Sequence, residues 1–251
     1  MGRTGKIWGQ NASLPLYNGA RLGYNLRMKT KIITIEGIDG SGKTVQFGKL
    51  LEGLRALGYS VETRSFPMYE AFFGKQVGRY LSGEEGVFAT EVDQKSMALW
   101  FAMDRWAAFA DWKDGEYDYL IINRYVLSNA VYQSIRDRDL DRPDIMDWVF
   151  DLEYGQLGLP RPDVNIFFDV AAESAGRNVD KKGFREYVGE GRDVYERSMG
   201  MQERARNMYR IAAERYDDVC IINCMKGDIL LPPDEIAKSV MDLLRERGIV
   251  E

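Results

Sequence analysis

The fold of this chain is decided by the stretch Gly37-Ile38-Asp39-Gly40-Ser41-Gly42-Lys43-Thr44. Two glycines separated by four residues precede a lysine and a hydroxyl residue, which is the spacing of a phosphate-binding loop. The glycines let the chain curl so that successive backbone N–H groups point at phosphate oxygens. An apolar run at 32–35 predicts a strand before the loop, and the residues after it predict a helix whose N-terminus is partly positive. The stretch therefore predicts a nucleotide-binding protein.

The residue types in this loop indicate what each would hold. Lys43 is expected to reach the β- and γ-phosphates of ATP, and the hydroxyl of Thr44 is expected to bind Mg²⁺. The residues predicted to surround the ATP phosphates are Gly37, Asp39, Gly40, Ser41, Gly42, Lys43 and Thr44. The loop alone does not identify the acceptor, because one fold supports many functions.

Short apolar runs alternate with helical stretches from residue 31 onward. The predicted strands are 31–36, 60–64, 119–123, 164–170 and 219–224. The predicted helices are 44–57, 90–112, 125–136, 144–157, 194–215 and 234–247. The runs 120–122, 164–168 and 219–222 are nearly continuous in apolar residues, as in strands buried on both faces of a parallel sheet. The pattern predicts an α/β fold of the P-loop NTPase type, a three-layer sandwich with a five-stranded parallel sheet.

The first 29 residues show no periodic pattern, and we interpret them as an N-terminal extension before a kinase domain at 30–251. Two alternatives stay open for this extension. It is either disordered, with the domain starting near Met28, or a flap packed on the surface through Leu14, Leu16 and Tyr17.

The composition restricts the chemistry. Histidine is absent from the 251 residues, which removes the commonest general base and the commonest zinc ligand. Phosphoryl transfer fits the remaining residue types, because it depends mostly on positioning and charge neutralisation. The net charge of −5 argues against a nucleic acid polymer or an anionic membrane as partner, and no apolar run is long enough to span a bilayer. Without a secretory signal, the cytoplasm is the expected location.

Four further clusters follow the loop along the chain. They are Phe66-Pro67-Met68-Tyr69-Glu70, Phe101-Ala102-Met103-Asp104-Arg105, Asn123-Arg124-Tyr125 running into Ser128-Asn129-Ala130-Val131-Tyr132-Gln133, and Arg192-Asp193-Val194-Tyr195-Glu196-Arg197. Phe66 ends a strand at the carboxyl edge of the sheet, where it would either stack on a pyrimidine ring or belong to the core. Arg124 follows a buried strand, where its fork could hold a monophosphate in line with the γ-phosphate.

Three polar residues of these clusters lie within predicted helices. Arg105 lies mid-helix and suits a nucleobase edge or a phosphate, with a surface salt bridge to Asp104 or Asp111 as the alternative. Asn129 and Tyr132 are three residues apart, so they share one helix face.

Taken together with the loop, these clusters resemble the thymidylate kinase family in order and spacing, from about Lys31 to the C-terminus. The family has a Phe-Pro element after its second strand, an Arg in the next helix, and an Asp-Arg-Tyr/His element after its third strand. Asn129 with Tyr132, and the Arg-Asp-x-Tyr-Glu arrangement, are similar to bacterial members. The resemblance implies transfer of the γ-phosphoryl group of ATP to dTMP by a homodimer, with the helix from about Thr90 as a plausible interface.

The resemblance also implies roles for individual residues. It gives Arg105 the contact with thymine, and it places Asn129 and Tyr132 against the base and the sugar. The residues that would line the deoxyribose and phosphate pocket are Asp39, Tyr69, Asp193 and Tyr195.

A basic segment at about 177–193 is expected to form a lid. Its basic residues are Arg177, Lys181, Lys182, Arg185 and Arg192, and its glycines would interrupt a helix. Such a segment would close over the phosphates and exclude water, or it is a solvated charged loop. Because Gly40 stands where some family members carry a catalytic Arg, we expect that residue to come from the lid, with Arg185 as first choice.

One residue departs from the family pattern. Asn123 stands where the family has Asp, so the predicted metal site of Thr44, Asp39 and Asn123 has less negative charge. Either Asp39 or Glu36 compensates, or turnover is reduced, or the acceptor differs.

Other functions compete with this interpretation. They are another P-loop deoxynucleotide or deoxynucleoside kinase, a GTPase-type switch, and a nucleotide-binding homologue of low activity. The chain lacks the Asn-Lys-x-Asp motif of a GTPase, since the nearest stretch is Met225-Lys226-Gly227-Asp228.

Overall fold

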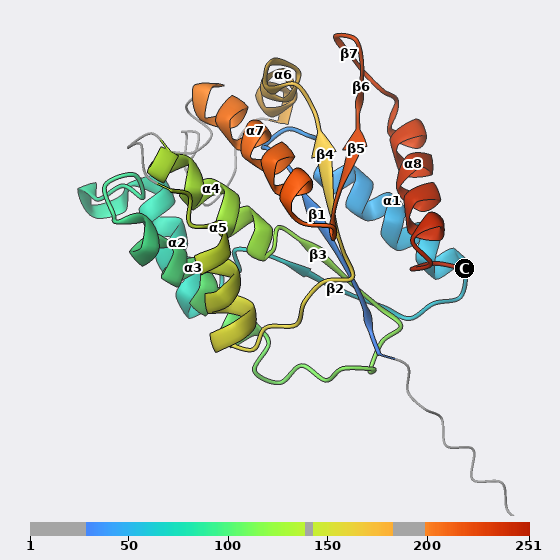
Figure 1. Cartoon of the computed structure of the whole chain (residues 1–251), viewed down its shortest axis with the longest axis horizontal. Coiled ribbons are helices and arrows are strands. Elements are labelled where there is room, and N and C mark those ends of the chain that lie inside the picture. The colour runs from blue at the N-terminus through green and yellow to red at the C-terminus, as the bar shows by residue number, and fades with distance from the viewer. Residues whose placement is uncertain (1–28, 139–142, 183–198) are drawn as a thin grey trace, which may run out of the picture.

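The computed structural model describes residues 29–138, 143–182 and 199–251, and it contains the predicted parallel sheet (Figure 1). The strands are β1 (Lys31–Glu36), β2 (Val61–Ser65), β3 (Tyr119–Asn123), β4 (Val164–Asp169) and β5 (Val219–Asn223). Their order is β2-β3-β1-β4-β5, and every pairing is parallel. Residues 1–28 of the predicted extension at 1–29 lie outside the described residues.

The centre of the sheet is its most buried part. β1 lies between β3 and β4, with Ile33 opposite Ile121 on one side and Val164 on the other. β3 and β4 are buried along nearly their whole length, as their apolar runs predict. The same prediction was wrong for β5, because β5 is an edge strand and Ile221 is 42% exposed.

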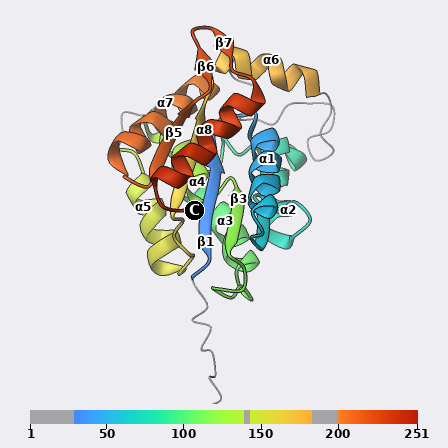
Figure 2. The same ribbon diagram turned by 90° about the vertical axis from the view of Figure 1, so that its right-hand side faces the viewer.

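Helices cover both faces of the sheet. They are α1 (Lys43–Ala56), α2 (Phe72–Ser82), η1 (Glu84–Gly86), α3 (Gln94–Ala108), α4 (Val126–Arg138), α5 (Met146–Phe150), η2 (Asp151–Gln156), α6 (Ala172–Lys182), α7 (Met199–Arg215) and α8 (Pro233–Glu246). Helices α1 and α8 pack together on one face, and α2, α3, α4, α5 and α7 cover the other (Figures 1 and 2). The three-layer sandwich is confirmed.

Among the described residues, no helix is both long and apolar enough to cross a membrane.

Helix α2 was not predicted from the sequence. Its glycines obscure the apolar repeat of Val77 and Leu81, which are both buried. A Cβ on Gly74 would stand 1.9 Å from the carbonyl oxygen of Met68, so only glycine lets this helix approach the segment that follows β2.

Several predicted segments have different boundaries in the structure. The predicted helix 90–112 is α3, which is shorter and covers Gln94–Ala108. The predicted helix 144–157 is α5 followed by the π-helix η2, which a helical periodicity of 3.6 cannot reveal. The predicted lid begins inside α6, which continues to Lys182, and the rest of the lid lies outside the described residues. The short hairpin of β6 (Met225–Lys226) and β7 (Ile229–Leu230) was not predicted, since two-residue strands carry no periodic signal.

Candidate active site

A cavity of about 400 Å³ lies at the carboxyl ends of the central strands, the edge at which open α/β sheets bind ligands. The predicted residues that line it are Asp39, Gly40, Gly42, Lys43, Thr44, Phe66, Tyr69, Arg105, Asn123, Arg124, Asn129 and Tyr132. Gly37 and Ser41 belong to the same loop without lining the cavity. Arg185, Asp193 and Tyr195 lie outside the described residues.

The loop between β1 and α1 is held closed by its own lysine. Nζ of Lys43 donates hydrogen bonds to the carbonyl oxygens of Gly37 at 2.9 Å and Ile38 at 2.7 Å. Gly42 caps the start of α1 with a φ of 88°, which glycine adopts without strain. The loop therefore has the backbone curvature that its spacing predicts, with the ammonium group held against the loop's own carbonyl oxygens.

Helix α6 packs against the loop at Gly40. A Cβ on Gly40 would stand 2.0 Å from the carbonyl oxygen of Ala175, and the side chain of Asn178 donates to the Gly40 carbonyl at 3.0 Å. A side chain at this position would therefore displace α6, which gives a physical reason why this chain has no Arg in the loop.

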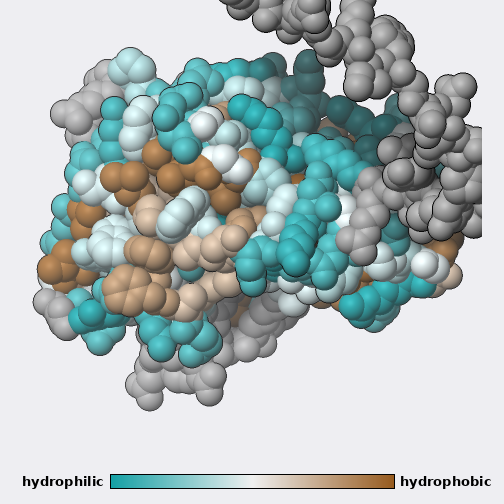
Figure 3. Space-filling view, turned by 90° about the horizontal axis from the view of Figure 1, so that it is seen from below, coloured by the Kyte–Doolittle hydropathy of each residue, from teal (hydrophilic) through white to brown (hydrophobic). Residues whose placement is uncertain are grey.

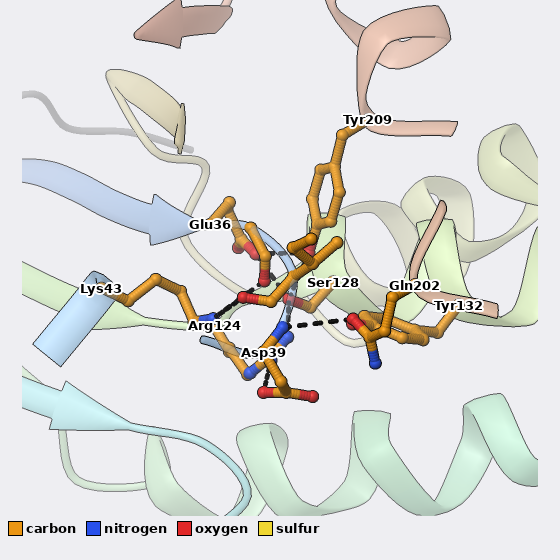
Figure 4. Close-up of polar contacts among 10 residues, drawn as sticks. Glu36, Asp39, Lys43, Arg124, Ser128, Tyr132, Gln202 and Tyr209 are labelled. Atoms are coloured by element: carbon orange, nitrogen blue, oxygen red, sulfur yellow. Dashed lines mark hydrogen bonds and ion pairs between the residues drawn. The ribbon is translucent and has the colours of Figure 1, made fainter. Parts of the chain in front are cut away.

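Arg124 connects the end of β3 to the loop (Figure 4). Its backbone N–H donates to the carbonyl of Ile35 at 3.0 Å, and Nη2 forms an ion pair with Oδ1 of Asp39. Its φ of 59° is left-handed, a conformation that costs about 1–2 kcal/mol in a non-glycine residue. Burial is the largest single effect and disfavours the charge of Arg124, but the attraction of the Asp39 carboxylate together with smaller contributions from Tyr132, Tyr209 and Glu36 outweighs it and places the pKa of Arg124 well above its ordinary value. The guanidinium is therefore a permanent positive charge in the cavity.

Glu36 is fully buried, and it contacts Ser128, as Arg124 also does (Figure 4). Its carboxylate accepts from the backbone N–H of Tyr125 at 2.7 Å, from Ser128 Oγ at 2.5 Å and from Tyr209 at 3.2 Å. Burial raises the pKa of Glu36, although the hydrogen bond from Ser128 works in the opposite direction. Because both oxygens are engaged and Glu36 does not line the cavity, the structure favours Asp39 over Glu36 as the carboxylate that compensates for the missing Asp.

The other end of the cavity contains the residues expected to contact a base. Phe66 is buried, and its ring stacks on Phe109 with centroids 6.3 Å apart, so it belongs to the core and also lines the cavity. Arg105 is 2% exposed and pairs with Glu153. The alternative of a surface salt bridge to Asp104 or Asp111 was therefore wrong.

The oxygen atoms near the loop are compatible with a magnesium ion. Oδ1 of Asn123 is buried without a hydrogen-bond partner among the described residues, and Thr44 is an exposed residue in the first turn of α1. Together with the carboxylate of Asp39, they line one cavity. Within the described ranges no three His, Cys, Asp or Glu side chains form a complete metal site. The three oxygen ligands of Thr44, Asp39 and Asn123 suit Mg²⁺, because this ion keeps several waters and phosphate oxygens as its other ligands.

Three residues of the site were not given a role from the sequence. Gln202 of α7 accepts from the backbone N–H of Asp39 at 3.2 Å and contacts the Tyr132 hydroxyl at 3.5 Å (Figure 4). Gln133 lines the cavity, and neither of its buried amide atoms has a partner among the described residues. Its place one residue after Tyr132 could have drawn attention to it. The third, Glu153, had no signal beyond a carboxylate in an apolar stretch.

Comparisons with known proteins agree on one family. The sequence profile described as Thymidylate kinase matches residues 35–227. The chain is 37% identical over 181 residues to the thymidylate kinase of Mycobacterium tuberculosis, which covers 71% of this chain and 83% of that protein. It is 28% identical over 221 residues to the probable thymidylate kinase of Thermococcus onnurineus, covering 85% and 98%. The solved structure of thymidylate kinase from Candida albicans shares the fold, with a TM-score of 0.67 at 20% identity over 89% of this chain and 94% of that one.

Proposed function

Because the chain belongs to the thymidylate kinase family, we propose that it transfers the γ-phosphoryl group of ATP to dTMP, giving dTDP and ADP. One observation carries this proposal. Lys43 and Arg124 line the same cavity from neighbouring strand ends, since Ile35 of β1 pairs with Asn123 of β3. A donor and an acceptor phosphate can therefore meet between them.

In this reaction a phosphate oxygen of dTMP attacks the γ-phosphorus of ATP. A new P–O bond forms as the bond between that phosphorus and the β,γ-bridging oxygen breaks, and the electron pair leaves with ADP. Lys43 stabilises the negative charge on the transferring group, and Arg124 holds the acceptor phosphate in line. Arg185 of the lid remains our prediction for a further positive charge.

Mg²⁺ is proposed to bind at Thr44, Asp39 and Asn123, where it would neutralise charge on the β- and γ-phosphates. Only Asp39 among these residues carries a negative charge, and it also pairs with Arg124. The site is therefore expected to bind its metal more weakly than one with a second carboxylate.

Asn123→Asp is accordingly expected to lower the Mg²⁺ concentration for half-maximal activity by at least about tenfold and to raise kcat. The measurement is ADP formation across a magnesium titration at saturating ATP and dTMP. Asn223→Asp is the matched control, because Asn223 also ends a strand but does not line the cavity. An Asn123→Asp titration that overlays the wild-type curve would remove Asn123 from the metal site.

The activity itself is tested by ADP production from Mg-ATP with dTMP, compared with dUMP, dCMP and thymidine. Turnover is expected with dTMP and with no nucleoside. Turnover of thymidine in place of dTMP would identify a deoxynucleoside kinase. Binding of ATP and dTMP without ADP formation would identify a nucleotide-binding homologue.

A homodimer is proposed from the apolar surface of α2 and α3. Phe72 of α2 is 70% exposed, and Leu99 and Trp106 of α3, seven residues apart on one helix face, are 43% and 45% exposed. Figure 3 shows apolar residues gathered on the side of the molecule where these helices lie. The mean mass in sedimentation is expected to be twice 28.8 kDa, and Trp106→Glu is expected to give the single-chain mass. A single-chain mass for the wild type would overturn the dimer.

The cytoplasmic location stays a prediction of the sequence.

A further inference from the structure

Glu153 is fully buried and engages two residues of the cavity wall at once. Its carboxylate accepts from Nε and Nη2 of Arg105, each at 2.5 Å, and from Nδ2 of Asn129 at 2.8 Å. Three elements thus meet at one carboxylate, since Arg105 belongs to α3, Asn129 to α4 and Glu153 to η2. Glu153 does not line the cavity, so it can influence a bound ligand only through Arg105 and Asn129.

The backbone around Glu153 is a π-helix. In η2 the N–H of Leu157 donates to the carbonyl of Leu152 at 2.9 Å, so this turn holds one residue more than an α-helical turn. Such turns change the direction in which side chains point and are frequent at functional sites. Here the π-helix carries Glu153 into contact with α3 and α4.

The contacts of Asn129 fix the orientation of its side-chain amide. Nδ2 donates to the backbone carbonyl of Ala98 at 3.0 Å as well as to Glu153, and both of these partners are acceptors only. The amide therefore cannot be reversed without losing both bonds. Its Oδ1 is buried and has no hydrogen-bond partner among the described residues, and Asn129 lines the cavity, so this residue has one acceptor of fixed orientation left for a ligand.

Arg105 supplies the complementary donor. Glu153 engages the Nε and Nη2 side of the guanidinium, which leaves Nη1 as the nitrogen outside that pair. A donor from Arg105 and an acceptor from Asn129 match an edge with a carbonyl next to a ring N–H, as in thymine and uracil. Cytosine presents an amino donor next to a ring nitrogen acceptor, which is the opposite pattern.

We infer that Glu153 is the positioning residue that sets the base selectivity of the enzyme, by fixing the acceptor of Asn129 and the donor of Arg105 toward a 4-oxo pyrimidine. This inference rests on the proposed function, because it concerns the acceptor nucleotide of that reaction. Glu153 itself touches neither substrate nor reacting atoms.

The test compares Glu153→Gln and Glu153→Asp with the wild-type enzyme on dTMP and dCMP. In Glu153→Gln the new amide can donate to Asn129, whose amide can then turn its own N–H₂ toward the base. The ratio of kcat/KM for dTMP to that for dCMP is expected to fall at least about tenfold, mainly through the KM for dTMP. Glu153→Asp keeps an acceptor-only carboxylate and is expected to retain the ratio within about threefold. The KM for ATP is expected to stay unchanged in both variants, which a general loss of structure would not allow.

Asp144→Asn is the matched control, since Asp144 forms a two-bond pair with Arg215, 3.0 Å for each bond, and does not line the cavity. It is expected to leave the ratio of kcat/KM for dTMP to that for dCMP, and the KM for ATP, unchanged. If neither Glu153 variant folds, a crystal structure of the wild-type enzyme with dTMP decides: Nδ2 of Asn129 is expected on Glu153 and Oδ1 on the base N3–H. A reversed amide, or a Glu153→Gln enzyme with wild-type selectivity, would overturn the inference. A wild-type enzyme inactive on dTMP would overturn the proposed function instead.

Discussion

Replacing Lys43 by alanine is expected to lower the rate of ADP formation from Mg-ATP and dTMP at least about a thousandfold. Lys43 carries the only positive side chain of the loop at 37–44, and its Nζ already lies within 2.9 Å of the loop's own backbone oxygens. When a nucleotide binds, phosphate oxygens can replace those carbonyls as acceptors. The ammonium group would then stabilise the negative charge that develops on the leaving ADP as the γ-phosphoryl group is transferred. Alanine removes this charge without altering the glycines that shape the loop. The measurement is steady-state ADP release at saturating ATP and dTMP.

Lys49→Ala provides the control for the loss of one lysine from α1. Lys49 forms a surface ion pair with Asp234 at 2.5 Å and does not line the cavity, so its rate is expected to stay within about twofold of wild type. Thermal unfolding of both variants separates catalysis from stability, because Lys43→Ala loses two hydrogen bonds worth about 1 kcal/mol each. If Lys43→Ala keeps more than a tenth of the wild-type rate, the loop does not act on the transferring phosphate.

The sequence allowed the parallel sheet and the phosphate loop to be predicted, because both are encoded over short distances. β1 and β3 match their predicted bounds, since 32–35 and 119–122 are mostly apolar and each is followed by a polar residue. The edge position of β5 could not be read from its residues, because strand order depends on how helices cross the sheet. Helix α2 was missed because its glycines serve close packing and weaken the helical pattern.

The residues of the site could be predicted where they belong to a motif that is continuous in sequence. They could not be predicted where two interacting residues are far apart in the sequence. Arg124 and Asn129 belong to one short cluster, and both line the cavity as expected. The sequence suggests Asp104 or Asp111 as an ion-pair partner of Arg105, whereas the partner is Glu153, 48 residues away. Only tertiary packing and a π-helix bring that carboxylate to the guanidinium. The lid residues Arg185, Asp193 and Tyr195 lie outside the described residues, and their roles stay predictions.

Replacing Arg124 by lysine is expected to lower kcat/KM for dTMP at least about a hundredfold, while the KM for ATP stays within about twofold. The guanidinium of Arg124 is held by Asp39 on one side, and Nη1 lies 3.4 Å from Ser128 Oγ on the other. This arrangement directs a planar donor fork at the acceptor phosphate, whereas lysine keeps the charge but offers a single point donor. Arginine and lysine adopt the left-handed φ of 59° at similar cost, so the exchange leaves the backbone contribution unchanged. The measurement is a full titration of dTMP at saturating ATP, and of ATP at saturating dTMP.

Arg215→Lys is the matched control, because Arg215 also forms a two-bond pair with a carboxylate, that of Asp144, away from the cavity. It loses the same fork and keeps the same charge, so any general effect of the exchange would appear in it as well. Its kinetic constants are expected to equal those of the wild type. A rise in the KM for ATP with an unchanged KM for dTMP would place Arg124 on the donor side of the cavity. If the Arg124→Lys enzyme is as active as the control, no acceptor phosphate is held between the ends of β1 and β3. The geometric basis for phosphoryl transfer in this cavity would then be lost.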